Sequence, residues 1–168
     1  MRKLLHRGAE ADVVLVEGWC GFDLVVCKIR KPKPHLPASL DERIRRTRTL
    51  HEARMLHAAK EVGVRTPALY LVDLPSCSLY MEYVRGPTLM ELIESGSAAA
   101  NSLMEEFGSL VATLHRGGIA HGDPTPANAI VMGGSSLCLL DFGLSFHTNR
   151  VEDFATDLHL LTVLLQGY

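Results

Sequence analysis

Three polar side chains in the second half of the chain have the types and the spacing that phosphoryl transfer needs. Asp123 follows His121 and Gly122, Asn128 lies five residues further on, and Asp141 opens an Asp-Phe-Gly tripeptide. A carboxylate such as Asp123 can accept or orient the proton of an attacking oxygen. Asn128 and Asp141 offer the hard oxygen ligands that Mg²⁺ prefers. In this order, the two motifs predict transfer of a nucleotide's phosphoryl group.

Two charged residues in the first half lie where apolar residues would be expected. Lys28 lies inside an apolar strand, and Glu52 shares a predicted helix face with Met55, Leu56 and Ala59. Charged side chains are rarely buried without a partner, so an ion pair between Lys28 and Glu52 would satisfy both. The alternative is that Lys28 faces solvent and Glu52 lies at the edge of the apolar stripe.

The turn near the N-terminus reads Gly8-Ala9-Glu10-Ala11 and contains no G-x-G-x-x-G loop. One glycine still permits a tight bend, and backbone N–H groups can still approach a phosphate. Glu10 has the wrong sign for direct contact with phosphate. We therefore expect its carboxylate to contact Lys28 or the long helix instead.

The elements that must position these residues fall into two groups. The first group is mostly strands around one long helix, with a proline-rich loop at 31–37: strands at 4–6, 13–16, 24–29, 64–73 and 79–84, and the helix at 39–59. Ser39 and Glu42 are expected to form a capping box at the start of that helix. The second group is mostly helical: helices at 89–93, 102–114 and 154–165, and a strand hairpin at 130–132 and 137–140.

This order predicts an α+β fold in a single domain. A small β-rich lobe with one long helix would span residues 1–83, and a mostly helical lobe would span residues 84–168. Such two-lobed units commonly hold a ligand in the cleft between their lobes.

The composition of the 168 residues narrows the possible classes. The chain is 47% hydrophobic and 21% charged, which excludes a disordered tail, a collagen-like repeat and a small disulfide scaffold. Its formal net charge is −2, so no basic field covers the whole molecule for binding nucleic acid.

The four cysteines, Cys20, Cys27, Cys77 and Cys138, show no C-x-x-C pair and no zinc spacing. We expect buried free thiols in a reducing compartment. The N-terminus lacks the pattern of a secretory signal, and no run approaches the roughly 18 apolar residues of a membrane span. We expect a cytoplasmic protein with no membrane partner.

Basic residues gather at 28–33 and along the predicted long helix, where Arg43, Arg45, Arg46, Arg48 and Arg54 occur. A solvated helix face is one explanation, and a platform for phosphate or RNA is the other. Aromatic residues make up only 6% of the chain and do not interleave with this cluster, so base stacking is not indicated.

Over nearly its whole length the sequence resembles the small atypical kinases of the KEOPS (EKC) complex, the PRPK-type family, which is related to the RIO kinases. The features specific to that family are the Gly-Ala-Glu-Ala turn and the helix segment Arg-Thr-x-x-Glu-Ala that contains Glu52. The others are a hinge-like Met81-Glu82-Tyr83-Val84, the Asp-Asn-Asp set described above and Asp157-Leu158.

The resemblance implies a protein-kinase-like bilobal fold that uses ATP and Mg²⁺. It implies an ATPase or serine/threonine kinase that supports the tRNA N6-threonylcarbamoyladenosine modification. The direct partner would be the threonylcarbamoyl-transferase subunit of the KEOPS complex. A small regulatory subunit would bind the N-lobe, and tRNA would be contacted indirectly.

Roles for individual residues follow from the same resemblance, position by position. Lys28 would contact the α- and β-phosphates and pair with Glu52, near the turn formed by Gly8, Ala9, Glu10 and Ala11. Backbone groups at Glu82 and Val84 would hold adenine. Asp123 would be the catalytic base, Asn128 and Asp141 would hold Mg²⁺, and Asp157 would brace the catalytic loop.

The sequence departs from the family before Asp157, where Asp-Phe-Ala-Thr replaces the usual Asp-Lys-Ala-Val, and at two further places. The catalytic loop reads Pro124-Thr125-Pro126-Ala127 where an apolar residue, Thr, Thr and Ser are usual, and two prolines stiffen it. The sequence given ends at Tyr168, soon after Asp141, so we expect a minimal C-lobe without a platform for peptide substrates. Transfer to water, to the protein itself or to a bound partner is then expected.

Two other functions remain open. A small-molecule phosphotransferase of the aminoglycoside or choline kinase type also uses a His-Gly-Asp…Asn loop, often with a proline placed as Pro126 is. Such enzymes usually need a larger helical lobe. The third possibility is a nucleotide-binding scaffold with little turnover, against which Lys28, Asp123, Asn128 and Asp141 argue.

Overall fold

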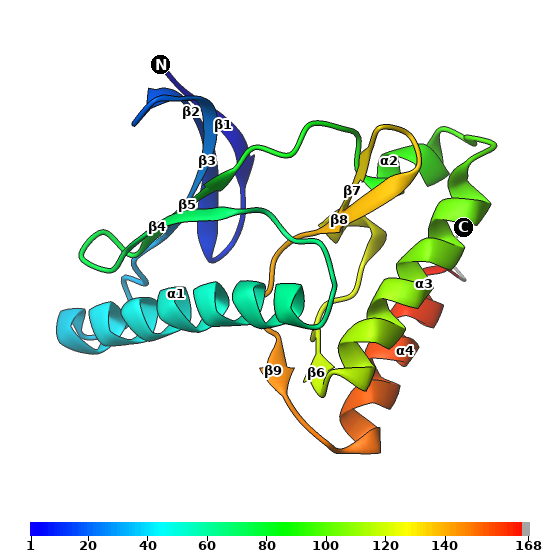
Figure 1. Ribbon diagram of the computed structural model, residues 1–168. Coiled ribbons are helices and arrows are strands. Elements are labelled where there is room, and N and C mark those ends of the chain that lie inside the picture. The colour runs from blue at the N-terminus through cyan, green and yellow to red at the C-terminus, as the bar shows by residue number, and fades with distance from the viewer. Residues whose placement is uncertain (166–168) are drawn as a thin grey trace. The chain divides into compact units, whose positions relative to one another are not determined.

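The computed structural model describes residues 1–165, and these form two compact units. Unit 1 comprises Met1–Arg54 and Pro67–Tyr83, and unit 2 comprises Met55–Thr66 and the chain from Val84 onward. Strands and helices are mixed, as the sequence predicts (Figure 1).

Unit 1 is built on a five-stranded antiparallel sheet with the strand order β1-β2-β3-β5-β4. Its elements are β1 (Arg2–Arg7), β2 (Ala11–Trp19), β3 (Phe22–Arg30), α1 (Ala38–Glu61, which continues into unit 2), β4 (Leu69–Asp73) and β5 (Ser78–Glu82). Val25 and Cys27 of β3 are buried on one face of the sheet. Lys28 and Arg30 alternate with them and therefore belong to the opposite face.

Helix α1 begins at Ala38, one residue earlier than the sequence predicts. The carbonyl of Pro37 accepts from the N–H groups of Leu40 and Asp41, so Ser39 lies inside the first turn and the predicted capping box is wrong. Proline suits this boundary because its fixed φ fits the entry to a helix and it has no N–H to leave unpaired.

Strand β4 is shorter than predicted, since it begins at Leu69 and not at residue 64. Pro67 removes a ladder donor just before the strand. The hydroxyl of Thr66 instead donates to the carbonyl of Leu56, at 3.1 Å. The segment before the strand is thus tied to the C-terminal part of α1.

Unit 2 is mainly helical around two short sheets. Its elements are α2 (Leu89–Glu94), α3 (Ala100–Arg116), β6 (Ile119–Ala120), the 3₁₀ turn η1 (Pro126–Asn128), β7 (Ala129–Met132), β8 (Ser136–Leu139), β9 (Phe146–His147) and α4 (Val151–Leu165). Strands β7 and β8 form the predicted hairpin, and β6 pairs with β9. The sequence did not reveal β6 or β9, because two residues are too few to show a period.

The apolar face of α3 anchors the core of unit 2. Leu103, Phe107, Val111 and Leu114 are buried at helical spacing. Helix α2 begins with a capping box in which Thr88 and Glu91 bond each other's backbone N–H groups. This cap was not predicted, although its Thr-x-x-Glu pattern is present in the sequence.

All four cysteines are free, as expected, but only Cys27, Cys77 and Cys138 are buried. Cys20 lies exposed in the turn between β2 and β3, so the prediction of burial is wrong there. Burial raises the pKa of the Cys27 thiol and keeps it protonated. Within residues 1–165 no helix is both long enough and apolar enough to cross a membrane.

Candidate active site

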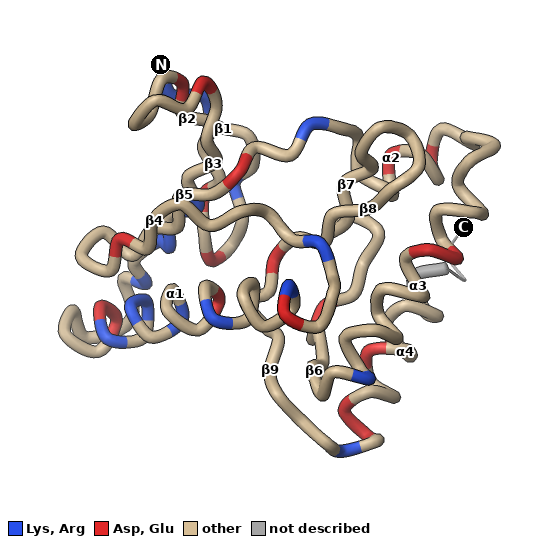
Figure 2. Tube along the Cα trace, in the orientation of Figure 1, with Lys and Arg blue, Asp and Glu red and all other residues tan. Residues whose placement is uncertain are grey.

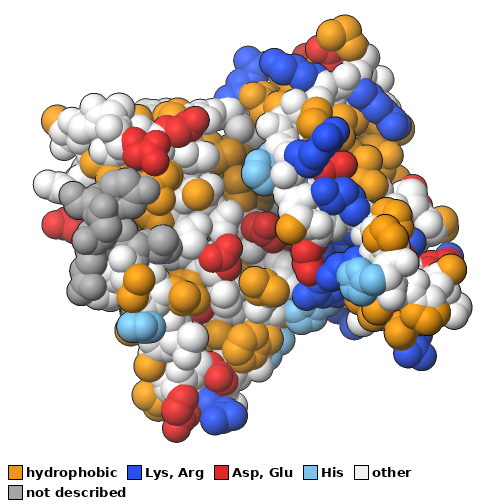
Figure 3. All heavy atoms as spheres, turned by 180° about the vertical axis from the view of Figure 1, so that it is seen from behind, with side chains coloured by type: hydrophobic (Ala, Val, Ile, Leu, Met, Phe, Trp, Pro, Cys, Tyr) orange, Lys and Arg blue, Asp and Glu red, His pale blue; other side chains and the backbone are white. Residues whose placement is uncertain are grey.

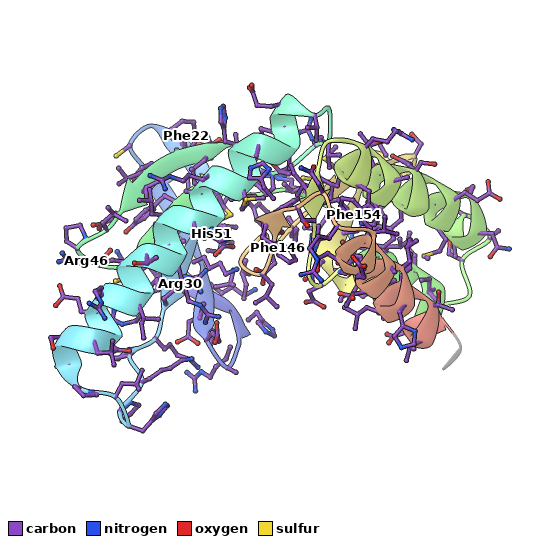
Figure 4. The ribbon with its side chains drawn as sticks, turned by 90° about the horizontal axis from the view of Figure 1, so that it is seen from below. Phe22, Arg30, Arg46, His51, Phe146 and Phe154 are labelled. Carbon is purple, nitrogen blue, oxygen red and sulfur yellow. The ribbon has the colours of Figure 1, made fainter. Side chains whose placement is uncertain are left out.

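The loop that carries Asp123 is fixed by Asp157, a carboxylate of α4 that is only 1% exposed. Asp157 Oδ2 accepts from the backbone N–H of His121 at 2.7 Å, and Oδ1 accepts from that of Gly122 at 2.8 Å. Oδ2 also lies 2.9 Å from His115 Nε2 on α3, and the His115 ring packs against Phe154 of α4, which is labelled in Figure 4. The predicted bracing role of Asp157 is confirmed.

His121 is a buried residue that shapes the loop from inside. Burial lowers the pKa of its imidazole, so the ring is neutral and Nδ1 can accept a hydrogen bond. The N–H of Asp123 donates to this nitrogen at 3.3 Å. The ring packs against Phe142 of the Asp-Phe-Gly segment, and Ser145 donates to the His121 carbonyl at 2.8 Å. His121 therefore connects the two motifs through its ring and through its backbone.

Gly122 allows these two segments to pass each other closely. Its φ is +81°, a region that favours glycine, and a Cβ at this position would lie 2.4 Å from the carbonyl oxygen of Leu144. Any side chain would push the segment after Phe142 away from Asp123.

Asn128 holds Asp123 in place with its amide nitrogen. Nδ2 donates to the Asp123 carbonyl at 3.1 Å and to Asp123 Oδ2 at 2.9 Å. Both partners are acceptors, so the amide nitrogen must face them, and Oδ1 takes no part in these bonds. Pro126 starts the 3₁₀ turn that presents Asn128. The unusual Pro-Ala pair is thus compatible with the position of Asn128.

Asp141 lies next to Asn128 at the base of the β7–β8 hairpin. The N–H of Leu140, the residue before Asp141, donates to the Asn128 carbonyl at 2.7 Å. Asp141 adopts φ +54°, and its Oδ1 accepts from the N–H of Gly143 at 3.3 Å. Aspartate tolerates this left-handed conformation better than most residues because it can bond locally.

The donor set of this loop suits a hard cation. Asn128 and Asp141 supply one carboxamide oxygen and one carboxylate, and Mg²⁺ commonly takes one or two protein ligands and completes its shell with water and phosphate. Residues 1–165 contain no group of three or more His, Cys, Asp or Glu side chains placed to hold a metal by themselves. The ligands therefore fit a cation that arrives with a phosphate better than a structural metal.

In unit 1 the predicted ion pair is present. Lys28 Nζ lies 2.6 Å from Glu52 Oε1, and both side chains are largely buried. Arg30 contacts the other oxygen of the same carboxylate, with NH2 2.5 Å from Oε2. Arg30 is 7% exposed, and its place in this cluster was not predicted. The sequence did contain a signal for this position. Arg30 lies two residues after Lys28, and residues at that spacing share one face of a strand.

The turn at Gly8–Ala11 is closed by a bond from the Gly8 N–H to the Ala11 carbonyl at 2.9 Å. The Gly8 N–H is therefore engaged within the turn. Glu10 reaches the long helix α1, as expected, because Arg48 of that helix donates to the Glu10 carboxylate. Lys33, in the loop before the helix, donates to the same carboxylate at 3.0 Å. These bonds lower the pKa of Glu10 to about 2, and the bond from Arg48 has a larger effect than the bond from Lys33.

The predicted hinge lies at the end of β5. The N–H of Glu82 donates to the Ala68 carbonyl at 2.8 Å, and the Glu82 carboxylate accepts from the Ala68 N–H at 3.0 Å. If adenine binds at Glu82, it must therefore use the carbonyl oxygen of that residue. Val84 follows in unit 2 and is buried.

Most Lys and Arg residues belong to unit 1, and they form repeated bands along α1 (Figure 2). On the face drawn in Figure 3 they gather over the same unit. Arg45 pairs with Asp41 at 2.7 Å and Arg46 with Glu42 at 2.6 Å, each one turn apart on the helix. These local pairs favour the explanation of a solvated helix face over that of a platform for RNA.

Comparisons with known proteins agree with this chemistry. The family model described as "ABC1 atypical kinase-like domain" matches residues 47–165. The chain is 39% identical to a "Probable bifunctional tRNA threonylcarbamoyladenosine biosynthesis protein" of Methanobrevibacter smithii, over 98% of this chain and 29% of that protein. It is 37% identical to "KEOPS complex subunit Bud32" of Pyrococcus abyssi, over 95% of this chain and 74% of that protein. It thus spans less than a third of the first relative's length.

Among solved structures, the chain is similar to the Rio2 kinase of Chaetomium thermophilum, crystallised as an ADP/Mg²⁺-phosphoaspartate complex. The TM-score is 0.81 at 16% identity, over 96% of this chain and 53% of that one. At this identity the likeness shows the fold, which is protein-kinase-like as the sequence predicts.

Proposed function

The chain belongs to the ABC1 atypical kinase-like family, and from this premise we propose that it is an ATP-dependent kinase or ATPase that uses Mg²⁺. The observation that carries the proposal is the loop in which Asn128 bonds Asp123 and lies beside Asp141. Asp157 and His121 hold this loop before any substrate binds. Preorganised polar groups of this kind supply most of the catalysis in phosphoryl transfer.

In the proposed reaction, the oxygen of an acceptor attacks the γ-phosphorus of ATP. A new P–O bond forms, the bond to the β,γ-bridging oxygen breaks, and ADP leaves. The carboxylate of Asp123 takes the proton of the attacking oxygen. Asn128 Oδ1 and the Asp141 carboxylate would hold Mg²⁺, which neutralises phosphate charge when bound.

Unit 1 would supply the rest of the nucleotide site. Lys28, held by Glu52, would face the α- and β-phosphates. In the turn, the N–H groups of Ala9 and Glu10 donate to no other group in the described part of the chain, so they are the donors that could reach a phosphate. We place adenine at the backbone of Glu82 and Val84. The two lobes, 1–83 and 84–168, would form one kinase-like domain.

The cellular role is proposed from the names of the relatives. A KEOPS complex subunit and a tRNA threonylcarbamoyladenosine biosynthesis protein both align with nearly all of this chain. We propose that the chain works in the cytoplasm within such a complex. Its direct partner would be the threonylcarbamoyl-transferase subunit, with a small regulatory subunit on the N-lobe and tRNA contacted indirectly.

The test is ATP turnover by the purified chain, with and without Mg²⁺ and the transferase subunit. We expect phosphate release that requires Mg²⁺ and rises with the transferase, and Asp141→Asn should lower it by about 100- to 1,000-fold. Glu152→Gln, at an exposed residue of α4, is the control and should match the wild type. Release stimulated only by a small acceptor would favour a small-molecule phosphotransferase instead. Nucleotide binding with little or no phosphate release would favour a scaffold.

A further inference from the structure

The Gly8–Ala11 turn carries one charged side chain, the carboxylate of Glu10, to which the proposed reaction gives no role. Arg48 of α1 donates to Oε2 of this carboxylate, and Lys33 of the loop before α1 donates to Oε1 at 3.0 Å. Arg30 of β3, labelled in Figure 4, places its NH1 3.8 Å from Oε2. Side chains from a helix, a loop and a strand of unit 1 therefore meet at one carboxylate of the turn.

The partners of Glu10 are themselves anchored to α1. The backbone N–H of Lys33 donates to Oδ1 of Asp41 at 2.9 Å, and Asp41 belongs to the first turn of the helix and is only 4% exposed. Arg30 NH2 donates to the Arg48 carbonyl at 3.4 Å. Arg48 is part of the helix. The contacts of Glu10 thus connect the turn to α1 by three routes.

The backbone of the turn has few bonds of its own. The Gly8 N–H donates to the Ala11 carbonyl at 2.9 Å, and the Glu10 carbonyl accepts from the Lys31 N–H at 2.9 Å. A short turn with so few bonds opens easily when nothing else restrains it. The side-chain bonds of Glu10 supply a further restraint, next to the N–H groups of Ala9 and Glu10 that we propose as phosphate donors.

The charge of Glu10 shows that its side chain does not act by contact with phosphate. Its pKa is lowered to about 2, chiefly by the bond from Arg48, so the carboxylate is ionised at neutral pH. Two negative groups repel each other, so a phosphate in direct contact with this carboxylate would be destabilised. The carboxylate can help a phosphate to bind only through the position that it gives to the backbone of the turn.

We propose that Glu10 and Arg48 are positioning residues that hold the turn against α1 and so preorganise the N–H groups of Ala9 and Glu10 for phosphate. A preorganised turn loses less conformational freedom when the nucleotide binds, and the nucleotide therefore binds more tightly. The inference rests on the proposed function for its effect on nucleotide binding. The order of the turn in the absence of nucleotide does not depend on that function.

The first test measures this order without any ligand. Relaxation of ¹⁵N nuclei in the full chain gives the order parameters of the amides at positions 9 and 10, which we expect near about 0.85 in the wild type. Glu10→Gln and Arg48→Gln should each lower them to about 0.6 or less. The matched controls are Glu17→Gln, at an exposed carboxylate of β2, and Arg46→Gln, two residues from Arg48 and so on another side of α1. Both controls should keep the wild-type values.

The second test measures nucleotide binding by isothermal titration calorimetry. Glu10→Gln and Arg48→Gln should each raise the Kd of ADP with Mg²⁺ about three- to tenfold, and each should leave the Kd of adenosine, which has no phosphate, unchanged. The double variant should bind ADP no more weakly than the weaker single variant, because both substitutions break the same contact. A purely electrostatic action predicts opposite signs, since one substitution removes a negative charge and the other removes a positive charge.

The outcomes separate this inference from the proposed function. If Glu10→Gln leaves the order parameters of the turn unchanged, or if they are already below about 0.6 in the wild type, the positioning role is wrong. The role is also wrong if Glu10→Gln tightens ADP binding, if adenosine binding weakens as much as ADP binding, or if the effects of the two substitutions add. If the wild type binds no nucleotide, the proposed function fails, and the order parameters still decide whether Glu10 and Arg48 hold the turn.

Discussion

The two units hold their candidate site residues by different kinds of contact. In unit 1, Lys28, Arg30 and Glu52 are held mainly by one another's side chains, between a strand and a helix. In unit 2, Asp157 holds the loop around Asp123 through backbone N–H groups, and the Asn128 amide bonds the carbonyl and one carboxylate oxygen of Asp123.

This difference has a consequence for stability. When charged side chains bond only to one another, all of them can be replaced at once. Replacing buried ion pairs by apolar residues in this way is often neutral or stabilising. A carboxylate that satisfies backbone N–H groups cannot be removed in this way, because the N–H groups remain when the side chain is gone. Unit 1 should therefore tolerate a concerted replacement, and unit 2 should not tolerate any replacement of Asp157.

The largest effect is expected at Asp157. Asp157→Ala leaves the N–H groups of His121 and Gly122 and the ring nitrogen of His115 without their acceptor in a buried site. We expect a loss of about 5 kcal/mol in the free energy of unfolding, measured by urea denaturation with far-UV circular dichroism. Glu152→Ala, on the same helix, should change it by less than about 0.5 kcal/mol. A loss at Asp157 as small as that control would remove the distinction between the units.

The next largest effect is expected in unit 1, where the free energy of unfolding of a single variant is compared with that of a triple variant. Glu52→Leu alone takes away the carboxylate that Lys28 and Arg30 share and should cost about 3 kcal/mol. The triple variant Lys28→Met, Arg30→Met and Glu52→Leu removes both cations together with the carboxylate that they share and should lie within about 1 kcal/mol of the wild type. Urea denaturation followed by the fluorescence of Trp19, the single tryptophan, gives both values. A triple variant less stable than Glu52→Leu would contradict the expectation.

The smallest effect concerns the exposed end of the cluster, at Glu10. Its pKa in the folded state is about 2, against an ordinary value of 4.5. The stabilisation is therefore fully present above about pH 5 and is lost as the pH falls from 4.5 towards 2. Because the side chain is 42% exposed, solvent screening limits it to about 1 kcal/mol.

The measurement for Glu10 compares the wild type with Glu10→Gln at pH 7 and pH 3. The difference in unfolding free energy should be largest at pH 7 and shrink at pH 3, where the Glu10 carboxylate has taken up a proton in the unfolded chain but is still ionised in the folded protein. A difference that grows on acidification would show that the carboxylate is not stabilised by Arg48 and Lys33.

Much of the site could be predicted because its chemistry is local in the sequence. The spacing of Asp123 and Asn128 and the tripeptide at Asp141 pointed to the loop that we propose to be catalytic. Lys28 and Glu52 could be paired because each was a charge within an apolar pattern, and burial demands a partner. The hairpin of β7 and β8 and the central part of β3 followed from strand patterns that need no distant contact.

The remaining features depended on contacts between distant segments. Whether Arg30 faces Glu52 or solvent depends on the face that β3 turns towards α1, and a slip of one residue would reverse it. The partners of Glu10 on α1 and of His115 on α4 likewise follow from packing, which no local pattern records. The sequence by itself determined which reactive side chains this protein carries and how they are spaced along the chain. Only the tertiary structure decided which charges share a carboxylate, because that choice depends on burial and distance.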